Sequence, residues 1–232
     1  MSSIIYSDEH SWFSTVPEPY HERPEYAFFR GEPAIPDVLL IGDSISMNYT
    51  IGVRRRLEGR ANLYRAPNNC RSTRQILEEI EGYIGEIEWD IIHFNAGIHD
   101  LTWISHDGKT SSVGVGARQV SLEHYVRNMA RIVERLKDTG ATIIWATTTP
   151  VQEGTPWRAN EDALQYNNAA AEIMAANDIA TNDLYSLAAD RLTELQPPQN
   201  VHFTEFGAEV LAEQVARCIA DKLSDADTGH SD

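Results

Sequence analysis

The segment Val-Leu-Leu-Ile-Gly-Asp-Ser, residues 38–44, decides the fold class. Its four apolar residues form an uninterrupted run that stops at a glycine, an acid and a serine. Such a run is typical of a strand buried on both faces of a parallel sheet. Ser44 then lies at the carboxyl end of the strand, the edge at which open α/β sheets bind ligands. A helix that begins there also presents free backbone N–H groups, so Ser44 is a candidate functional residue.

Strand and helix patterns alternate along the rest of the chain. Strands are expected at 37–42, 61–65, 89–95, 141–147 and 179–183, and helices at about 46–58, 72–85, 121–138, 161–176 and 204–223. Alternation of this kind predicts right-handed crossovers between parallel strands. The expected fold is therefore a three-layer α/β/α sandwich with a parallel sheet of about five strands.

The chain divides into three parts by composition. Residues 1–36 are rich in proline, glutamate and aromatic side chains without a clear period, which predicts an irregular N-terminal arm packed on the body. Residues 37–224 form a single α/β domain, and the polar residues 225–232 are expected to fray. The glycine-rich segment 102–120 is too long for an ordinary connection and is expected to form a flap over the carboxyl edge of the sheet.

Charge and cysteine content exclude several classes of function. The formal net charge of −16 disfavours nucleic acid and anionic membrane surfaces as partners. Two cysteines are too few for a disulfide framework or a zinc site, and neither a metal-ligand motif nor a phosphate-binding glycine loop is present, so no cofactor or metal is expected. The absence of a signal peptide and of a membrane-length apolar span indicates a cytoplasmic protein. The oligomeric state stays open.

Polar clusters follow four of the expected strands and should converge on one crevice. Acyl transfer needs a nucleophile, a base and donors for the oxygen that becomes negative. Ser44 is the candidate nucleophile, and His202, just before the last helix, is the candidate base. The oxyanion donors would come from the backbone N–H groups of Ser44 and of Cys70 or Arg71. A side chain from the third cluster, His99 or Asn95, would supply the last donor.

Three blocks in this order resemble the SGNH or GDSL-type hydrolases over roughly residues 37–222. The blocks are Gly42-Asp43-Ser44, Gly97-Ile98-His99-Asp100-Leu101 and Val201-His202-Phe203-Thr204. The resemblance implies a flavodoxin-like fold, a serine nucleophile and a histidine base. It also implies that a glycine of the second block and an asparagine of the third help to bind the oxyanion. Enzymes of this family are esterases, lipases and, often, carbohydrate deacetylases.

The chain departs from the family pattern at three positions. His99 stands where the family has asparagine, with Asn95 as the reserve donor, and no glycine stands in the second block. Gln199 stands where the family has an acid, three residues before the histidine, and Asn200 follows it. We therefore expect a Ser–His dyad oriented by an amide or a backbone carbonyl. An acid from elsewhere could restore the triad, and the candidates are Asp100, Glu153 and Glu205.

These residues predict a serine esterase that removes a short acyl group from a small-molecule or oligosaccharide ester. Asp43 and Asp100 are the expected substrate-binding acids, although Asp100 could instead cap a turn. Arg71 and Arg74 are candidates to hold a substrate anion. A sugar-sized pocket has four candidate lining residues, which are His10, Trp12, His21 and Trp157. The rival interpretations are a catalytically silent saccharide-binding module of the same fold and a nucleotide-binding α/β domain.

Overall fold

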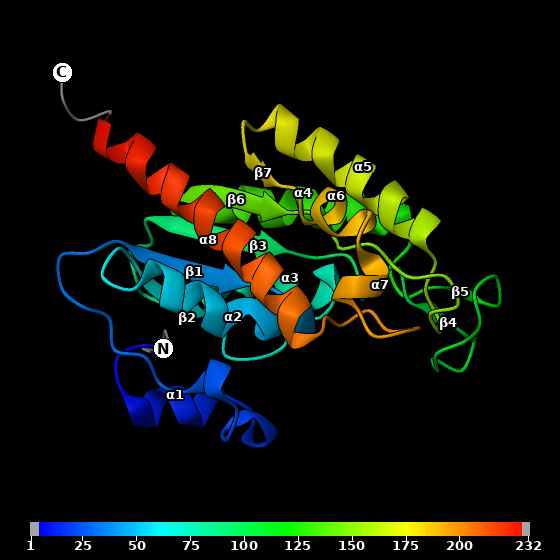
Figure 1. The fold of residues 1–232 in the computed structure, drawn as a ribbon, viewed down its shortest axis with the longest axis horizontal. Coiled ribbons are helices and arrows are strands. Elements are labelled where there is room, and N and C mark those ends of the chain that lie inside the picture. The colour runs from blue at the N-terminus through cyan, green and yellow to red at the C-terminus, as the bar shows by residue number, and fades with distance from the viewer. Residues whose placement is uncertain (1–4, 229–232) are drawn as a thin grey trace.

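The computed structural model describes residues 5–228 and contains a five-stranded parallel sheet between two layers of helices (Figure 1). The strand order is β2-β1-β3-β6-β7, so the chain crosses over to build the sheet outward from β1 in both directions. The strands are β1 (Asp37–Ile41), β2 (Asn62–Arg65), β3 (Ile91–Asn95), β6 (Thr142–Ala146) and β7 (Ala180–Asn182). The expected three-layer α/β/α sandwich is confirmed.

Strand β1 lies inside the sheet and forms parallel ladders with β2 on one side and β3 on the other. Its residues Val38 to Ile41 each expose 1% of their surface or less. A strand in this position has no face in water, which explains its continuous apolar run. The same burial fixes the position of its carboxyl end, where Ser44 follows.

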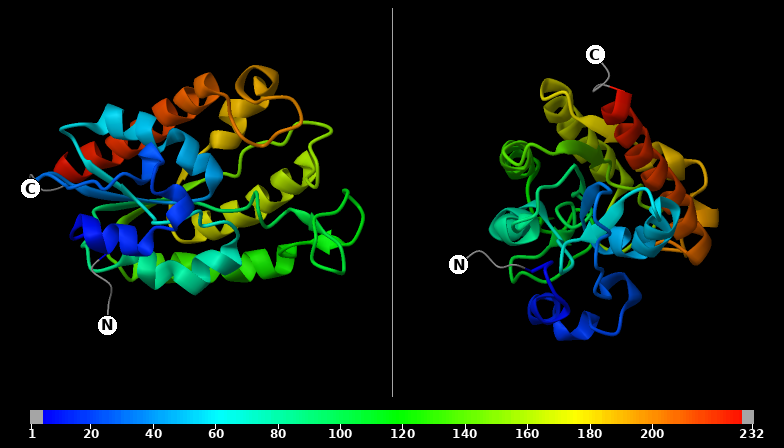
Figure 2. Two further views of the ribbon diagram at one scale, coloured as in Figure 1. Left: turned by 90° about the horizontal axis from the view of Figure 1, so that it is seen from below. Right: turned by 90° about the vertical axis from the view of Figure 1, so that its left-hand side faces the viewer.

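The helices cover the two faces of the sheet unequally. Figure 2 shows α2 and α8 on one face and α3, α4 and α5 on the other. Their bounds are α2 (Ser44–Leu57), α3 (Thr73–Ile84), α4 (Leu122–Lys137), α5 (Asn160–Ala176) and α8 (Glu205–Thr228). The contact between α2 and α8 brings the start of α2 near the loop that precedes α8, and this contact positions the site.

Three segments differ from the sequence-based prediction. The arm is not wholly irregular, because it contains α1 (Glu9–Thr15) and two 3₁₀ turns, Glu18–Tyr20 and Pro24–Tyr26. Two short helices, α6 (Leu184–Ala189) and α7 (Leu192–Leu195), lie in a segment to which no element was assigned. Helix α8 runs to Thr228, so the first residues of the expected frayed tail are helical, while 229–232 lie outside the described residues.

The arm packs on the body beside the edge strand β2. Trp12 is 4% exposed, and its indole Nε1 donates a hydrogen bond to the carbonyl of Tyr26 (2.6 Å). The Tyr26 ring in turn lies 4.6 Å from the guanidinium of Arg65, which is 1% exposed at the end of β2. A buried arginine needs such partners, so the arm completes the environment of Arg65.

Part of the segment 102–120 forms a two-stranded antiparallel unit, β4 (Trp103–Ile104) and β5 (Ala117–Arg118). It projects beyond the carboxyl edge of the sheet (Figure 1). The N–H of Trp103 donates to the carbonyl of Trp157 (2.8 Å), and its indole donates to Asp162 (2.9 Å). The flap is thereby fastened to the loop that follows β6 and to the start of α5. No helix within residues 5–228 is long and apolar enough to cross a membrane.

Candidate active site

Helix α2 presents Ser44 at the carboxyl end of β1. Asp43 is the N-cap of this helix, and its carboxylate accepts a hydrogen bond from the N–H of Ile45 (2.9 Å). Ser44 is the first helical residue, so its own N–H has no acceptor within the helix. The hydroxyl and the free N–H of Ser44 therefore lie together at a helix N-terminus, where a developing negative charge is stabilised.

Gly42, directly after β1, leaves room for the side chain of Asn95. A Cβ atom at this position would stand 2.3 Å from Oδ1 of Asn95, the last residue of β3. A larger residue at position 42 would therefore collide with the Asn95 side chain. Asn95 is 2% exposed and lies in the floor of the site rather than at its surface.

The structure brings Ser44 and His202 into direct contact. Their Oγ and Nε2 atoms are 2.9 Å apart, and Nδ1 of His202 is 2.9 Å from Oδ1 of Asn200. The amide oxygen can only accept, so Nδ1 carries the proton and donates it to Asn200. Nε2 is then free to accept the hydrogen of the Ser44 hydroxyl. This tautomer is the one that a general base requires.

The residues on both sides of His202 in the loop before α8 hold its imidazole in place. Val201 and Phe203, on either side of the histidine, are buried, and Thr204 caps α8 through the N–H of Gly207 (3.0 Å). Asn200 also accepts from the backbone N–H of His202 (3.0 Å). Gln199 makes no hydrogen bond to His202 and lies against Gly154 instead. Asn200, rather than Gln199, is thus the amide behind the imidazole.

No acid takes the place of that amide among the described residues. Asp100 binds the start of α3, and the structure shows no hydrogen bond from His202 to Glu153 or Glu205. Partial loss of hydration and the positive charges of Arg158 and Arg23 lower the pKa of His202 below its usual value of 6.5. The imidazole is therefore neutral at pH 7, which is the form that accepts a proton.

The expected backbone oxyanion donors of the second block are not free in this structure. The N–H of Cys70 donates to the carbonyl of Gly42 (3.2 Å), so the prediction that it serves as a donor is wrong. The N–H of Arg71 donates to Oδ1 of Asn69 (3.1 Å). Arg71 has a φ of +50°, the left-handed region that favours glycine. The arginine thus stands in a backbone conformation suited to the glycine that the family pattern has in this block.

His99 lies near enough to the dyad to interact electrostatically with His202. Burial, followed by the charges of Arg158, Arg71 and His202, lowers the pKa of His99 to about 4. The ring is partly exposed and makes no hydrogen bond to the residues that the structure describes. A neutral imidazole of this kind can donate one N–H to a substrate oxygen without titrating near pH 7.

The two acids expected to bind substrate are inaccessible. Asp43 and Asp100 both have 0% exposure, so the expectation of direct substrate contact is wrong. Asp100 accepts from the backbone N–H of Thr73 (3.0 and 3.1 Å) and from its hydroxyl, which makes it the cap of α3. Burial raises the pKa of Asp100 to about 7 and that of Asp43 to about 6. Both carboxyls hold helix starts rather than ligands.

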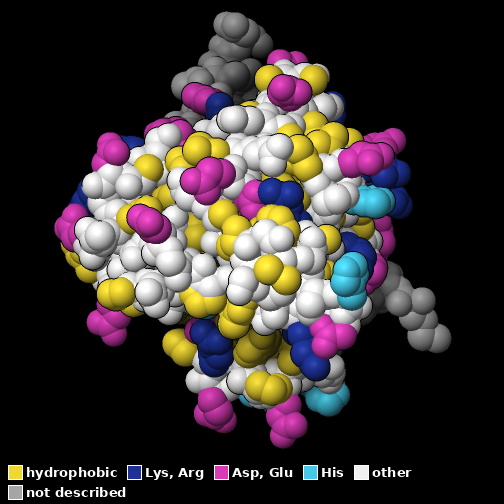
Figure 3. Space-filling view, turned by 90° about the vertical axis from the view of Figure 1, so that its right-hand side faces the viewer, with side chains coloured by type: hydrophobic (Ala, Val, Ile, Leu, Met, Phe, Trp, Pro, Cys, Tyr) yellow, Lys and Arg dark blue, Asp and Glu magenta, His cyan; other side chains and the backbone are white. Residues whose placement is uncertain are grey.

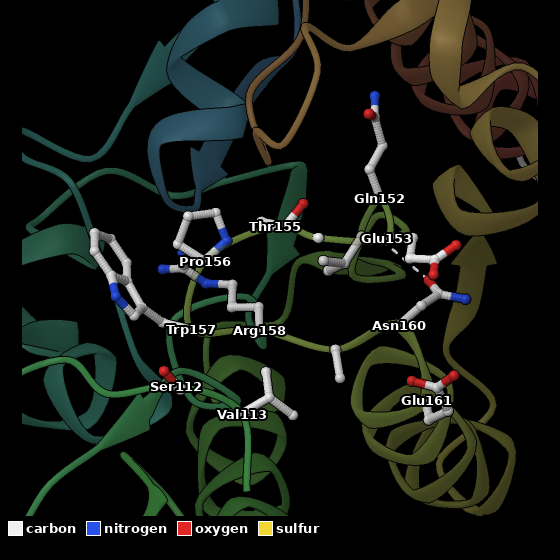
Figure 4. A pocket seen from close by; sticks show the side chains of 13 residues that line it. Ser112, Val113, Gln152, Glu153, Thr155, Pro156, Trp157, Arg158, Asn160 and Glu161 are labelled. Atoms are coloured by element: carbon white, nitrogen blue, oxygen red, sulfur yellow. Dashed lines mark hydrogen bonds between the residues drawn. The ribbon is translucent and has the colours of Figure 1, made fainter. Parts of the chain in front are cut away.

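A cavity of about 660 Å³ lies between the flap and the loop that follows β6 (Figure 4). Its lining includes Val113 from the flap and Glu153, Trp157 and Arg158 from the loop. Gly154 in this loop lies against Gln199, so the cavity adjoins the segment that carries His202. Figure 3 views the molecule from this side, where hydrophobic, basic, acidic and histidine side chains are interspersed.

Of the four residues expected to form a sugar-sized pocket, one lines this cavity. Trp157 is 42% exposed, whereas Trp12 lies on α1 of the arm and is buried. The ring of His21 bonds to the carbonyl of Val16 (2.8 Å) within the arm, and His10 is exposed on α1. Sequence reasoning missed Arg158, because an arginine in a loop without periodic pattern gives no signal of its position.

The fold and this arrangement define the class as a three-layer α/β protein with a serine and a histidine at the carboxyl edge of its sheet. Residues 40–210 match the model of the GDSL-like Lipase/Acylhydrolase family, so the chain belongs to that family. The resemblance seen in the three sequence blocks is thereby confirmed. Family membership supports a hydrolase of the esterase type.

Solved structures of similar fold include a lipase/acylhydrolase from Enterococcus faecalis. It is 19% identical with a TM-score of 0.68, and the match covers 81% of this chain and 97% of that one. An acetyl xylan esterase is 15% identical with a TM-score of 0.64, and the match covers 79% of this chain and 99% of that one. An acetylxylan esterase from Geobacillus stearothermophilus is 17% identical with a TM-score of 0.64, and the match covers 81% of this chain and 94% of that one. No curated protein matches the chain by sequence.

Proposed function

We propose that the protein is a serine esterase that removes a short acyl group, such as acetyl, from a polar alcohol such as a carbohydrate. The observation that carries this proposal is the distance of 2.9 Å between Ser44 Oγ and His202 Nε2, with Asn200 on the opposite ring nitrogen. A hydroxyl bonded to a correctly oriented neutral imidazole is the arrangement of an activated serine. The acetyl substrate is favoured by the two acetylxylan esterases of similar fold.

The reaction follows from these positions. Ser44 Oγ attacks the ester carbonyl and its proton passes to Nε2 of His202, while Asn200 holds the imidazolium through Nδ1. The N–H of Ser44 and the ring N–H of His99 donate to the oxygen that becomes negative. The alcohol leaves with the proton from Nε2. A water molecule then attacks the acyl-enzyme, again with His202 as base, and releases the acid and free Ser44.

The direct test is hydrolysis of para-nitrophenyl acetate by the wild-type protein and by Ser44→Ala. We expect kcat/KM to fall by roughly a thousandfold or more in the variant, because both the nucleophile and its bond to His202 are removed. Ser14→Ala, which makes the same change at an exposed position of α1, is the matched control and should keep wild-type activity. Equal rates for the wild type and Ser44→Ala would overturn the assignment.

A second candidate is a saccharide-binding module that has this fold without the activity. It is favoured by the amide of Asn200 behind His202, which stabilises an imidazolium less than a carboxylate does. Calorimetric titration with xylo-oligosaccharides separates the two functions. Binding of the saccharide by a wild-type protein that hydrolyses no ester would favour the module.

A further inference from the structure

Arg158 holds a positive charge without an ion-pair partner among the described residues, close to the dyad. Its Nε donates to the carbonyl of Ile98 (2.7 Å), which fixes the guanidinium beside the strand end that carries His99. The side chain is half-buried, and within residues 5–225 it forms no ion pair. Its two terminal nitrogens have no hydrogen-bond partner among the described residues. A guanidinium that has lost part of its hydration and whose terminal nitrogens lack a partner is suited to an external anion.

The charges around the cavity are separated into two ends. Figure 4 shows Arg158 directed toward Pro156 and Trp157, whereas Glu153 and Glu161 stand on the opposite side. The positive end is the one near His202 of the dyad and near His99, because the charge of Arg158 lowers the pKa values of both histidines. In a chain with a net charge of −16, such a local excess of positive charge stands out from the surface.

Further groups next to His99 and His202 add to the positive end. Arg71 is exposed, and its charge lowers the pKa of His99. The charge of Arg23, a residue of the arm, lowers the pKa of His202, and Arg23 also forms an ion pair with Glu25 (2.6 Å). The acid that acts on Arg158 is Asp43, whose carboxyl is fully buried beneath Ser44 and therefore cannot cover the terminal guanidinium nitrogens.

We propose that the site takes an ester that carries a carboxylate and that the terminal nitrogens of Arg158 bind this carboxylate at the Trp157 end of the cavity. The planar fork of an arginine matches the two oxygens of a carboxylate, and the open position of both terminal nitrogens allows a two-point contact. The face of Trp157 beside it offers an apolar surface to the ring or chain that bears the charge. This inference rests on the proposed esterase function and specifies its substrate class.

The experiment compares esters that differ only in that charge. In the first pair the carboxylate lies on the alcohol half of the ester, and para-acetoxybenzoate is compared with its uncharged methyl ester. In the second pair the carboxylate lies on the acyl half, and para-nitrophenyl hydrogen succinate is compared with its uncharged methyl ester. The readout is the ratio of kcat/KM for the carboxylate to kcat/KM for the methyl ester in each pair. We expect this ratio to fall roughly tenfold or more in Arg158→Gln for at least one pair, and the responding pair identifies the half that reaches Arg158.

Two comparisons guard against a merely structural effect. Arg158→Lys keeps the charge and should keep more of the ratio than Arg158→Gln does, and Arg127→Gln, an exposed arginine of α4, should leave the ratio unchanged. In the wild type, added NaCl should reduce the ratio of the responding pair, a measurement that needs no folded variant. Ratios for both pairs that are the same in the wild type and Arg158→Gln and do not respond to NaCl would overturn the proposal while the esterase function stands. Failure of the wild type to hydrolyse any of the four esters would overturn the function itself.

Discussion

At His202, an amide occupies the position from which a carboxylate would stabilise a positive imidazole more strongly. Asn200 supplies orientation, because its oxygen accepts from Nδ1, but it adds no negative charge. The charges of Arg158 and Arg23 also oppose protonation of the ring. The residues of this site therefore favour a neutral base and a nucleophile of moderate strength.

Replacement of Asn200 tests its positioning role. In Asn200→Asp the carboxylate should raise the pKa of His202 and stabilise the imidazolium, so kcat/KM should increase and its acid limb should move to higher pH. In Asn200→Ala the tautomer is no longer held, and kcat/KM should fall by about 10- to 100-fold. Asn168→Asp, an exposed amide on α5, is the control. Rates and pH profiles that are unchanged in both Asn200 variants would contradict this role.

The pH dependence of the wild type has a predicted sign. The base must be neutral, and lost hydration with the charges of Arg158 and Arg23 lowers its pKa below 6.5. Activity should thus persist as the pH falls through that value and be lost only below it. Removal of a positive charge in Arg158→Gln should move the acid limb of kcat/KM to higher pH. A wild-type limb at or above pH 6.5 would show that the site does not disfavour the imidazolium.

At the scale of single elements, buried carboxyls hold the helix starts that shape the site. Asp43 caps α2 and Asp100 binds the first N–H of α3. Both have raised pKa values because burial disfavours the charged form. Ionisation of either buried acid costs stability, so the stability of these two helix starts depends on pH.

Asp100→Asn isolates this coupling. The pKa of Asp100 is raised from 3.8 to about 7, so its stabilising contribution is present below pH 3.8 and is lost as the pH rises through 7. The free energy of unfolding of the variant minus that of the wild type should therefore increase between those values, at a slope approaching about 1.4 kcal/mol per pH unit. Urea denaturation over this range measures it. A difference that does not vary with pH would contradict the raised pKa.

The sequence predicted the five strands and the five main helices because short apolar runs alternate with longer helical segments along the chain. It missed α1, whose signal was only the cap at Asp8, and it missed α6 and α7, which are too short to show a period. For the site, the positions of Ser44 and His202 at element ends could be predicted from the chain. The partner of Nδ1, the occupied N–H of Cys70 and the position of Arg158 depend on loop geometry, which local pattern does not specify.

At the scale of the whole molecule, the arm and the body share one core. Trp12 and Tyr26 lie over β2 and enclose the buried Arg65, while Arg23 in the same arm acts electrostatically on His202. The arm therefore contributes both to stability and to the charge of the site, although it precedes the region that the family model matches.

Trp12→Ala measures how strongly the arm stabilises the fold. The side chain is 4% exposed and its indole is hydrogen-bonded, so its loss should lower the free energy of unfolding by about 3–5 kcal/mol. The matched control is Trp157→Ala, where the ring is 42% exposed and the change should stay below about 1 kcal/mol. Urea denaturation monitored by circular dichroism compares them. Losses of equal size would contradict a structural role of the arm.

The central claim is that Ser44 is an activated nucleophile because His202 accepts its proton. Labelling with a fluorophosphonate, followed by mass mapping of the modified peptide, tests it most directly because such probes report the nucleophile without a chosen substrate. We predict a covalent adduct on Ser44 in the wild type and its loss in both Ser44→Ala and His202→Ala. A folded wild-type protein that stays unlabelled, or a label on Ser44 that forms equally fast in His202→Ala, would contradict the account.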